Sequence, residues 1–183
     1  MAKPFPSLND AHIEMIAAQH IFFTATATAT SRINISPRPT DCFRVISPNK
    51  VAYRDLPGSG AETAAHVKAD GRMTILFCTF AGAPLLLRLN GKGQSHERGT
   101  AGYRDLIDTD FAGEEPVGTR QVVTLDVDYV QTSCGYGVPL FEFTADRPNL
   151  ARWAETKGEE GLKEYRRQKN SVSLDGLPAL AAE

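Results

Sequence analysis

The stretch HIFFTATATAT, His20–Thr30, decides the fold class of this chain. From Phe23 to Thr30, one face carries only Phe or Ala and the other carries only Thr. Side chains alternate between two faces in a β-strand, and the β-branched Thr favours strands. The stretch therefore predicts a strand, and its small Ala face predicts the close approach of another layer.

Further strand patterns follow along the chain, each a short run of alternating or apolar residues. They are SRINISPRP (31–39), FRVIS (43–47), VAYRD (51–55), RMTILFCTF (72–80), PLLLRLNGKGQSHE (84–97) and TRQVVTLDVDYVQT (119–132). Short turns between several of them favour antiparallel pairing. Closure of roughly six or seven strands into a barrel would remove the exposed sheet edges. An open α+β sheet is the alternative.

Helical patterns flank the expected sheet. Ser7 can cap a first helix over about 8–19, and a second is expected over about 60–70. A short helix is expected within 101–110, and the tail over about 148–170 predicts two helices broken at Gly158. The last dozen or so residues are expected to form a loop or loose end. Because 183 residues suit a single core, 1–183 is expected to be one domain.

Composition limits the classes of partner and cofactor. The formal net charge of −2 argues against a clustered basic surface, so we expect no nucleic-acid or membrane partner. The start MAKPFPSLND lacks the apolar core of a signal peptide, and a cytoplasmic location is the expectation. The three cysteines, Cys42, Cys78 and Cys134, form no CxxC pair, so we expect free thiols and no metal site.

The stretch LPGSGAETAAHV, Leu56–Val67, places a Gly-Ser-Gly turn directly before the second helix. Ser59 and Glu62 fit a capping box, which is a purely structural interpretation. The other interpretation is an anion site, in which the free N–H groups of the helix start and the hydroxyls of Ser59 and Thr63 hold a phosphate. The pattern is neither a Walker loop nor GxGxxG, so both interpretations stay open.

Two arginines lie in strand patterns. Arg38 follows Asn34 and Ser36 in NISPRP, which suits a phosphate, a planar ring rich in heteroatoms, or an ordinary edge strand. Arg88 lies inside the apolar run LLLRLN, where it either lines a cleft or occupies the outer face of its strand.

Cys134 follows the last expected strand, in QTSCGYGVPLFEF. A reactive thiol, half of a disulfide, a metal ligand and a turn residue are the alternatives. The odd cysteine count and the absent ligand spacing argue against a disulfide and a metal. Since no His is placed beside Cys134, a catalytic thiolate is not expected. The stretch predicts a turn in which two glycines let the backbone approach another group closely.

The order of these motifs resembles the pyridoxamine 5′-phosphate oxidase-like family of FMN-binding split β-barrels, and more closely an uncharacterised bacterial branch of it. The resemblance runs roughly from Asn9 to Pro178, and its most specific blocks are DLPGSGAET and QTSCGYGVPL. It implies a mainly β fold with flanking helices, a six-stranded antiparallel split barrel. It also implies a homodimer that holds FMN in a cleft between the subunits.

The resemblance further implies which residues meet the cofactor. The matching positions are Asn34, Ser36, Arg38, Tyr53, Arg54, Asp55, Ser59, Gly60, Thr63 and Arg88. The second subunit would contribute Cys134, Tyr136 and Trp153. Many family members carry a phosphate-binding Lys after the third strand, whereas this helix start offers Glu62 and Thr63. Phosphate binding would then rely on Arg38, Arg54 or backbone N–H groups.

The function implied by the resemblance is an FMN-dependent oxidoreductase that acts on an unidentified small molecule. The flavin would carry the hydride chemistry, and no catalytic protein residue is assigned. No segment matches the basic C-terminal residues that hold pyridoxamine phosphate in the true oxidases, so vitamin B6 oxidation is not expected. The alternatives are a deazaflavin-dependent reductase and a non-enzymatic flavin or haem binder or sensor, with His20, His66 or His96 as possible haem ligands.

Overall fold

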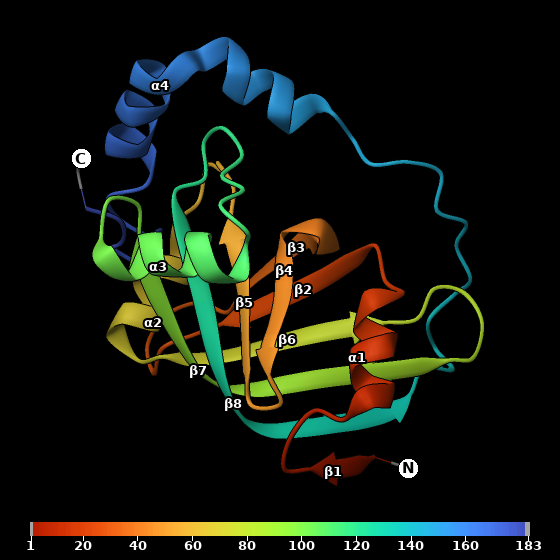
Figure 1. Ribbon diagram of the computed structural model, residues 1–183. Coiled ribbons are helices and arrows are strands. Elements are labelled where there is room, and N and C mark those ends of the chain that lie inside the picture. Colours follow the sequence, from red (N-terminus) through yellow and green to blue (C-terminus); the bar gives the residue numbers. More distant parts are fainter. Residues whose placement is uncertain (1, 182–183) are drawn as a thin grey trace.

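The computed structural model describes residues 2–181, and its centre is an antiparallel sheet of eight strands that curls on itself (Figure 1). The strands are β1 (Lys3–Phe5), β2 (Ile21–Thr26), β3 (Asn34–Pro39), β4 (Phe43–Ser47), β5 (Lys50–Asp55), β6 (Arg72–Cys78), β7 (Leu85–Glu97) and β8 (Gln121–Cys134). Their order in the sheet is β3-β2-β6-β7-β8-β5-β4, and the short β1 pairs with β8 outside this path.

The mainly β, antiparallel fold class is confirmed, while the strand count is higher than expected. The additional strand is β1, which pairs with the second half of β8 from Lys3 opposite Thr132 to Phe5 opposite Val130. Pro4 lacks an N–H group, so this strand can only lie at a sheet edge. A three-residue strand that contains proline carries no alternating pattern, which explains why the sequence did not predict it.

The strand that begins in HIFFTATATAT ends earlier than its pattern suggests. β2 stops at Thr26, and the chain turns because Thr28 and Ser31 hydrogen-bond each other's backbone N–H groups, at 2.8 and 3.0 Å. Hydroxyl side chains offer the backbone this local alternative to a sheet ladder. The turn allows β3 to start at Asn34 and pair along the whole of β2.

The core lies inside the curled sheet. Phe22 of β2, Phe43 of β4 and Phe77 of β6 contact one another, with ring centroids 5.0 to 5.5 Å apart. Since β2 and β4 lie near opposite ends of the sheet, these contacts join its two halves through side chains.

In the described part of the chain four α-helices surround the sheet: α1 (Asp10–Ala17), α2 (Glu62–Ala69), α3 (Ala101–Asp110) and α4 (Asn149–Lys169). Figure 1 shows α4 passing over one end of the barrel. A break at Gly158, with φ of 64°, divides α4 as its sequence predicts. Within residues 2–181, every helix is too short or too polar to cross a bilayer.

Two predicted helix caps are wrong. Asn9, and not Ser7, caps α1, because its side chain accepts from the backbone N–H of His12 while the His12 ring accepts from Asn9. Ser59 does not cap α2, whose N-cap residue is Ala61 and has no capping side chain. The Ser59–Glu62 capping box is therefore absent, and the Glu62 carboxylate instead accepts a hydrogen bond from the backbone of Leu174.

Candidate cofactor site at the seam of the barrel

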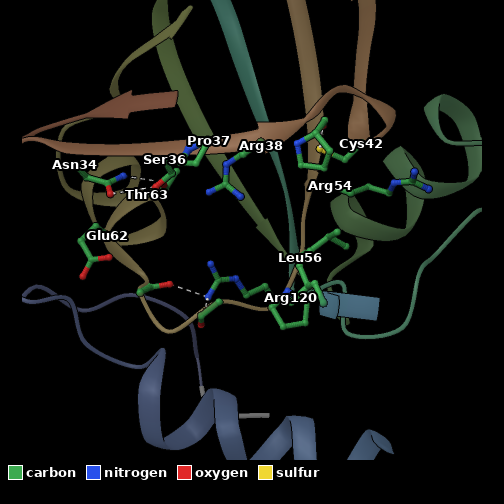
Figure 2. Close-up of a pocket in the computed structure, with 15 residues that line it drawn as sticks. Asn34, Ser36, Pro37, Arg38, Cys42, Arg54, Leu56, Glu62, Thr63 and Arg120 are labelled. Atoms are coloured by element: carbon green, nitrogen blue, oxygen red, sulfur yellow. Dashed lines mark hydrogen bonds between the residues drawn. The ribbon is translucent and has the colours of Figure 1, made fainter. Parts of the chain in front are cut away.

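A pocket of about 230 Å³ opens where the curled sheet fails to close (Figure 2). At this seam Arg38 of β3 forms an ion pair with Asp55 of β5, although the two strands are separated by four others in the sheet order. The polar side chains that line the cavity, called here the seam pocket, are Asn34, Ser36, Arg38, Cys42, Arg54, Glu62, Thr63 and Arg120. Pro37, Pro39, Leu56, Pro57 and Leu150 provide most of its apolar lining.

Asp55 lies beneath the seam pocket and organises its charges. This carboxylate is 0% exposed and accepts hydrogen bonds from Arg38, from Arg120 Nε at 2.8 Å and from Gln121 Nε2 at 2.6 Å. Burial by itself would raise the pKa of Asp55, but the charges of Arg120 and Arg38 outweigh burial and lower that pKa to about 2. In this cluster two guanidinium groups share one carboxylate, and the Glu62 carboxylate lines the same cavity.

Arg120 also fixes the Gly-Ser-Gly turn that forms one wall. Its Nη1 donates to the carbonyl of Gly60 at 2.8 Å and to that of Gly58 at 3.2 Å. Sequence reasoning missed Arg120, because it precedes β8 as an ordinary polar residue before an apolar run. Only the pairing of β5 with β8 brings it to Asp55, whose backbone carbonyl accepts the Arg120 N–H at 3.0 Å.

Neutral donors line the opposite wall. The amide of Asn34 donates to Thr63 Oγ1 at 3.1 Å and to Thr26 Oγ1 at 3.2 Å, and Ser36 donates to Asn34 Oδ1 at 3.3 Å. Because Thr63 accepts from Asn34, its own O–H remains available as a donor. Figure 2 shows these side chains on one side, with Arg38 and Arg120 between them and Arg54.

Arg54 is held at the far end of the seam pocket by backbone carbonyls. Its Nη1 donates to Glu114 O at 2.8 Å and its Nη2 to Asp41 O at 3.3 Å, and the guanidinium lies 5.0 Å from the Phe111 ring centroid. The Nε–H of Arg54 is buried without a hydrogen-bond partner among the described residues. A buried orphan donor is costly, so a bound acceptor here would be favoured.

The structure brings several of the predicted cofactor residues to this one pocket. They are Asn34, Ser36, Arg38, Arg54, Gly60 and Thr63, with Asp55 directly below them. Tyr53 is fully buried behind Arg38, whose guanidinium carbon lies 4.7 Å from the centre of the Tyr53 ring. Ser59 is exposed and does not line the cavity.

The other predicted residues lie outside the seam pocket of their own chain. Arg88 lies on the outer face of β7 and donates to Ser133 Oγ at 3.0 Å. Cys134 ends β8 in an exposed position, and the Tyr136 side chain after it is 83% exposed. Trp153 of α4 packs edge-on against Tyr165, with ring centroids 5.0 Å apart.

The three cysteines differ sharply in accessibility, and this predicts their reactivity. Burial raises the pKa of Cys42 to about 12 and also raises the pKa of Cys78, whereas Cys134 is exposed. A thiol reagent at pH 8 is expected to modify one cysteine of the native protein rapidly and the other two only on unfolding. Mass spectrometry should locate the rapid label at Cys134, and Cys134→Ser should abolish it. Equal labelling of Cys42 in the native protein would contradict this.

Comparison with known proteins places the chain in a family. No protein-family model matches it. It is 40% identical to the pyridoxamine 5′-phosphate oxidase family protein ustO of Aspergillus flavus, in an alignment that covers 96% of this chain and 77% of that protein. That relative is fungal, so membership of a bacterial branch stays a prediction.

Solved structures show the same fold at low sequence identity. A putative pyridoxamine 5′-phosphate oxidase from Lactobacillus delbrueckii matches 69% of this chain and 94% of its own, with 14% identity and a TM-score of 0.53. HutZ, the haem storage protein of Vibrio cholerae, matches 71% of this chain and 98% of its own, with 14% identity and a TM-score of 0.50. These matches show the split-barrel fold. The 40% identity to ustO over nearly the whole chain shows that the chain belongs to the pyridoxamine 5′-phosphate oxidase family.

Proposed function

We propose that the protein binds FMN with the flavin phosphate in the seam pocket, and that it is a flavin-dependent oxidoreductase acting on a small molecule. The observation that carries this proposal is the Arg38–Asp55–Arg120 cluster, in which two guanidinium groups at the cavity share a single carboxylate. A buried guanidinium presents a planar fork of donors that matches phosphate oxygens. Membership of the pyridoxamine 5′-phosphate oxidase family supports the choice of a flavin.

The residues present fit the phosphate end of this cofactor. The seam pocket offers guanidinium groups on one side, the Thr63 hydroxyl on the other, and the orphaned Nε–H of Arg54. Its volume of about 230 Å³ is below the roughly 300–1,000 Å³ of sites that enclose a whole drug-sized ligand. The flavin ring would therefore lie outside the cavity, where a second subunit can cover it.

Each part of the chain has a defined task in this proposal. FMN, when bound, supplies the hydride acceptor and donor. Arg38 and Arg120 bind the phosphate, and Asp55 holds both guanidinium groups in place before the ligand arrives. Preorganised charges of this kind need no rearrangement when the anion binds.

A flavin titration tests the proposal. Purified protein is expected to bind FMN in the micromolar range or tighter, and then to accept electrons from NADH or NADPH. A parallel titration with the deazaflavin cofactor separates a deazaflavin-dependent reductase from an FMN enzyme. If the protein binds FMN but neither NADH nor NADPH reduces the bound flavin, the result would favour a flavin carrier or sensor over an enzyme. If the purified protein does not bind FMN at micromolar concentrations, the proposal is ruled out.

We also propose that the protein is a homodimer that uses the outer face of the sheet. The strand register places Phe23, Ile35, Leu76, Leu86 and Tyr129 on this face, opposite the core, and Ile35 is 66% exposed. Apolar side chains that share one face of a sheet and are at least partly exposed are typical of an interaction surface. The face also carries Arg88, so a second copy seated there would bring this predicted residue to the interface.

Leu76→Arg tests the homodimer. The strand register places Leu76 opposite Arg88, so an arginine at position 76 would bury a second, unpaired cation in the interface, and we expect the variant to be monomeric while its fold is retained. Light scattering after size exclusion measures the mass, and Leu76→Met is the matched control that should remain dimeric. A wild-type protein that is monomeric at tens of micromolar, or a variant that stays dimeric, would contradict the proposed interface.

A second candidate function, haem binding, is favoured by one histidine. His20 is exposed and stacks on Phe143 beside a cavity of about 470 Å³ whose lining includes Ile21, Phe23, Phe80 and Phe141. An apolar cavity with an accessible imidazole suits a porphyrin with an axial histidine. The other two predicted ligands are engaged, since His66 contacts Thr26 Oγ1 and His96 contacts Thr124 Oγ1, each at 3.1 Å.

Reconstitution of the purified protein with haem tests this second candidate function. Wild-type protein is expected to give a shifted Soret band, and His20→Ala is expected to lose it, whereas His96→Ala should retain it. An unchanged band in His20→Ala would remove His20 as the ligand.

A further inference from the structure

The last described part of the chain, residues 170–181, is not the loose end that its sequence suggests. This tail segment folds back on itself, with Ser173 N donating to Leu177 O at 2.9 Å and Leu180 N to Asn170 O at 3.0 Å. Leu180, together with residues 177 and 179, packs against two alanines of α2 and against the alanine that directly precedes this helix. These residues form a small cluster separate from the main core. The tail segment therefore has a fixed place beside α2.

The tail segment contacts the wall of the seam pocket that the Gly-Ser-Gly turn forms. Asn170 is 0% exposed, and its Nδ2 donates to Gly58 O at 2.9 Å, the same carbonyl that Arg120 reaches. Four residues further on, Leu174 N donates to the carboxylate of Glu62, at the start of α2, at 3.2 Å. Two points of this wall are thus tied to the tail segment.

The tail segment also contacts the chain just before β3, the strand that carries Asn34 and Ser36 of the opposite wall. The carboxylate of Asp175 accepts from Arg32 N at 2.8 Å and forms an ion pair with the Arg32 guanidinium. Arg32 lies just before β3, which begins at Asn34 and carries the neutral donors of the seam pocket. One short segment therefore spans two walls that come from distant parts of the chain.

We infer that Asn170 and Asp175 are positioning residues for the seam pocket: through Gly58 and Arg32 they hold its two walls at the separation that the anion requires. The inference rests on the proposed function for the identity of the anion, but the placement of the walls does not depend on it. Anion binding and docking of the tail segment are then coupled, and by linkage each must favour the other to the same degree.

Coupling of this kind differs from a general contribution to stability. The Arg32 side chain is 72% exposed, and exposed ion pairs contribute little to global stability. The main core lies inside the sheet and includes no residue of the tail segment. Local opening of the pocket walls is therefore expected to occur without unfolding of the sheet.

Hydrogen exchange of the full-length, ligand-free protein tests the inference with Asp175→Ala and Asn170→Ala. In Asn170→Ala we expect the amides in 56–63 to exchange about tenfold faster, and in Asp175→Ala those in 32–36. The amides of β6 to β8 should exchange as in the wild-type protein in both variants. Asp175→Asn keeps a side-chain oxygen for Arg32 N–H and should retain most of the protection. Asp108→Ala, which removes an exposed carboxylate of α3, is the matched control.

Ligand binding supplies the second measurement. Affinity for FMN and for inorganic phosphate is expected to fall about tenfold in Asp175→Ala, and saturating ligand should slow exchange in 170–181 of the wild-type protein. Unchanged exchange at both walls in both variants, or faster exchange throughout the sheet in both, would overturn the inference. Wild-type protein that binds neither ligand would refute the proposed function alone, because the ligand-free exchange still decides the positioning role.

Discussion

Asp55→Asn is expected to lower the free energy of unfolding by about 3–5 kcal/mol, the usual cost of removing one partner from a buried ion pair. Asp55 is 0% exposed and lies between the guanidinium groups of Arg38 and Arg120. Without its charge, two buried cations would face each other across the seam. The neutral amide would also turn an N–H donor toward groups that themselves donate, among them Gln121 Nε2.

Urea unfolding at pH 7 measures this effect. Asp126→Asn is the matched control, since Asp126 is half exposed on β8 and lies 3.8 Å from Lys50 Nζ. Exposed pairs contribute roughly 0–1 kcal/mol, so the control is expected to unfold almost as the wild-type protein does. An Asp55→Asn variant within about 1 kcal/mol of the wild type would show that the seam does not depend on this charge.

The pH dependence of stability follows from the same carboxylate. The pKa of Asp55 is lowered in the folded protein to about 2, so its stabilisation is fully present above the unfolded-state pKa near 4 and is lost as the pH falls toward 2. A shift of this size corresponds to a loss on the order of 2 kcal/mol. In Asp55→Asn this part of the acid dependence should disappear, which urea unfolding at a series of pH values can measure.

The second large effect is expected on ligand binding. Arg38→Gln should weaken FMN binding by about 10- to 100-fold, which is the range expected for losing a hydrogen bond to a charged group. The variant should still fold, because Asp55 retains Arg120 and Gln121 as partners. The seam pocket, however, loses one of the two guanidinium groups that would bind the phosphate.

Quenching of flavin fluorescence measures the affinity of each variant. Arg72→Gln removes an exposed guanidinium that is paired with Asp70, away from the seam pocket, and should bind FMN as the wild type does. If Arg38→Gln and Arg72→Gln bind FMN equally well, Arg38 does not contact the phosphate.

Local patterns explain how much of the fold was predictable. The alternation around Phe23, the apolar runs of β6 to β8 and the break at Gly158 each depend on neighbouring residues, and all appear in the structure. The β1 strand and the docked tail segment were missed, because both depend on partners distant in sequence. β1 pairs with β8, and the tail segment packs on α2.

The residues of the candidate site likewise fall into those that a local pattern predicts and those that only distant contacts bring together. Asn34, Ser36 and Arg38 alternate along one strand, so a single motif is enough to group them on one face. Arg120 and Asn170 reach the Gly-Ser-Gly turn from positions more than 60 residues away in sequence. No local pattern marks them, and only the register of β5 on β8 and the return of the tail segment bring them there.

The most direct test of phosphate binding in the seam pocket compares FMN with riboflavin, which differs only by lacking the phosphate. Titrations of the wild-type protein are expected to show FMN binding about 100-fold or more tighter than riboflavin, since several charge-assisted hydrogen bonds depend on the phosphate. In Arg38→Gln this difference should shrink through the loss of FMN affinity, with riboflavin affinity unchanged. Equal affinities of the wild-type protein for FMN and riboflavin would contradict the assignment of the seam pocket as a phosphate site.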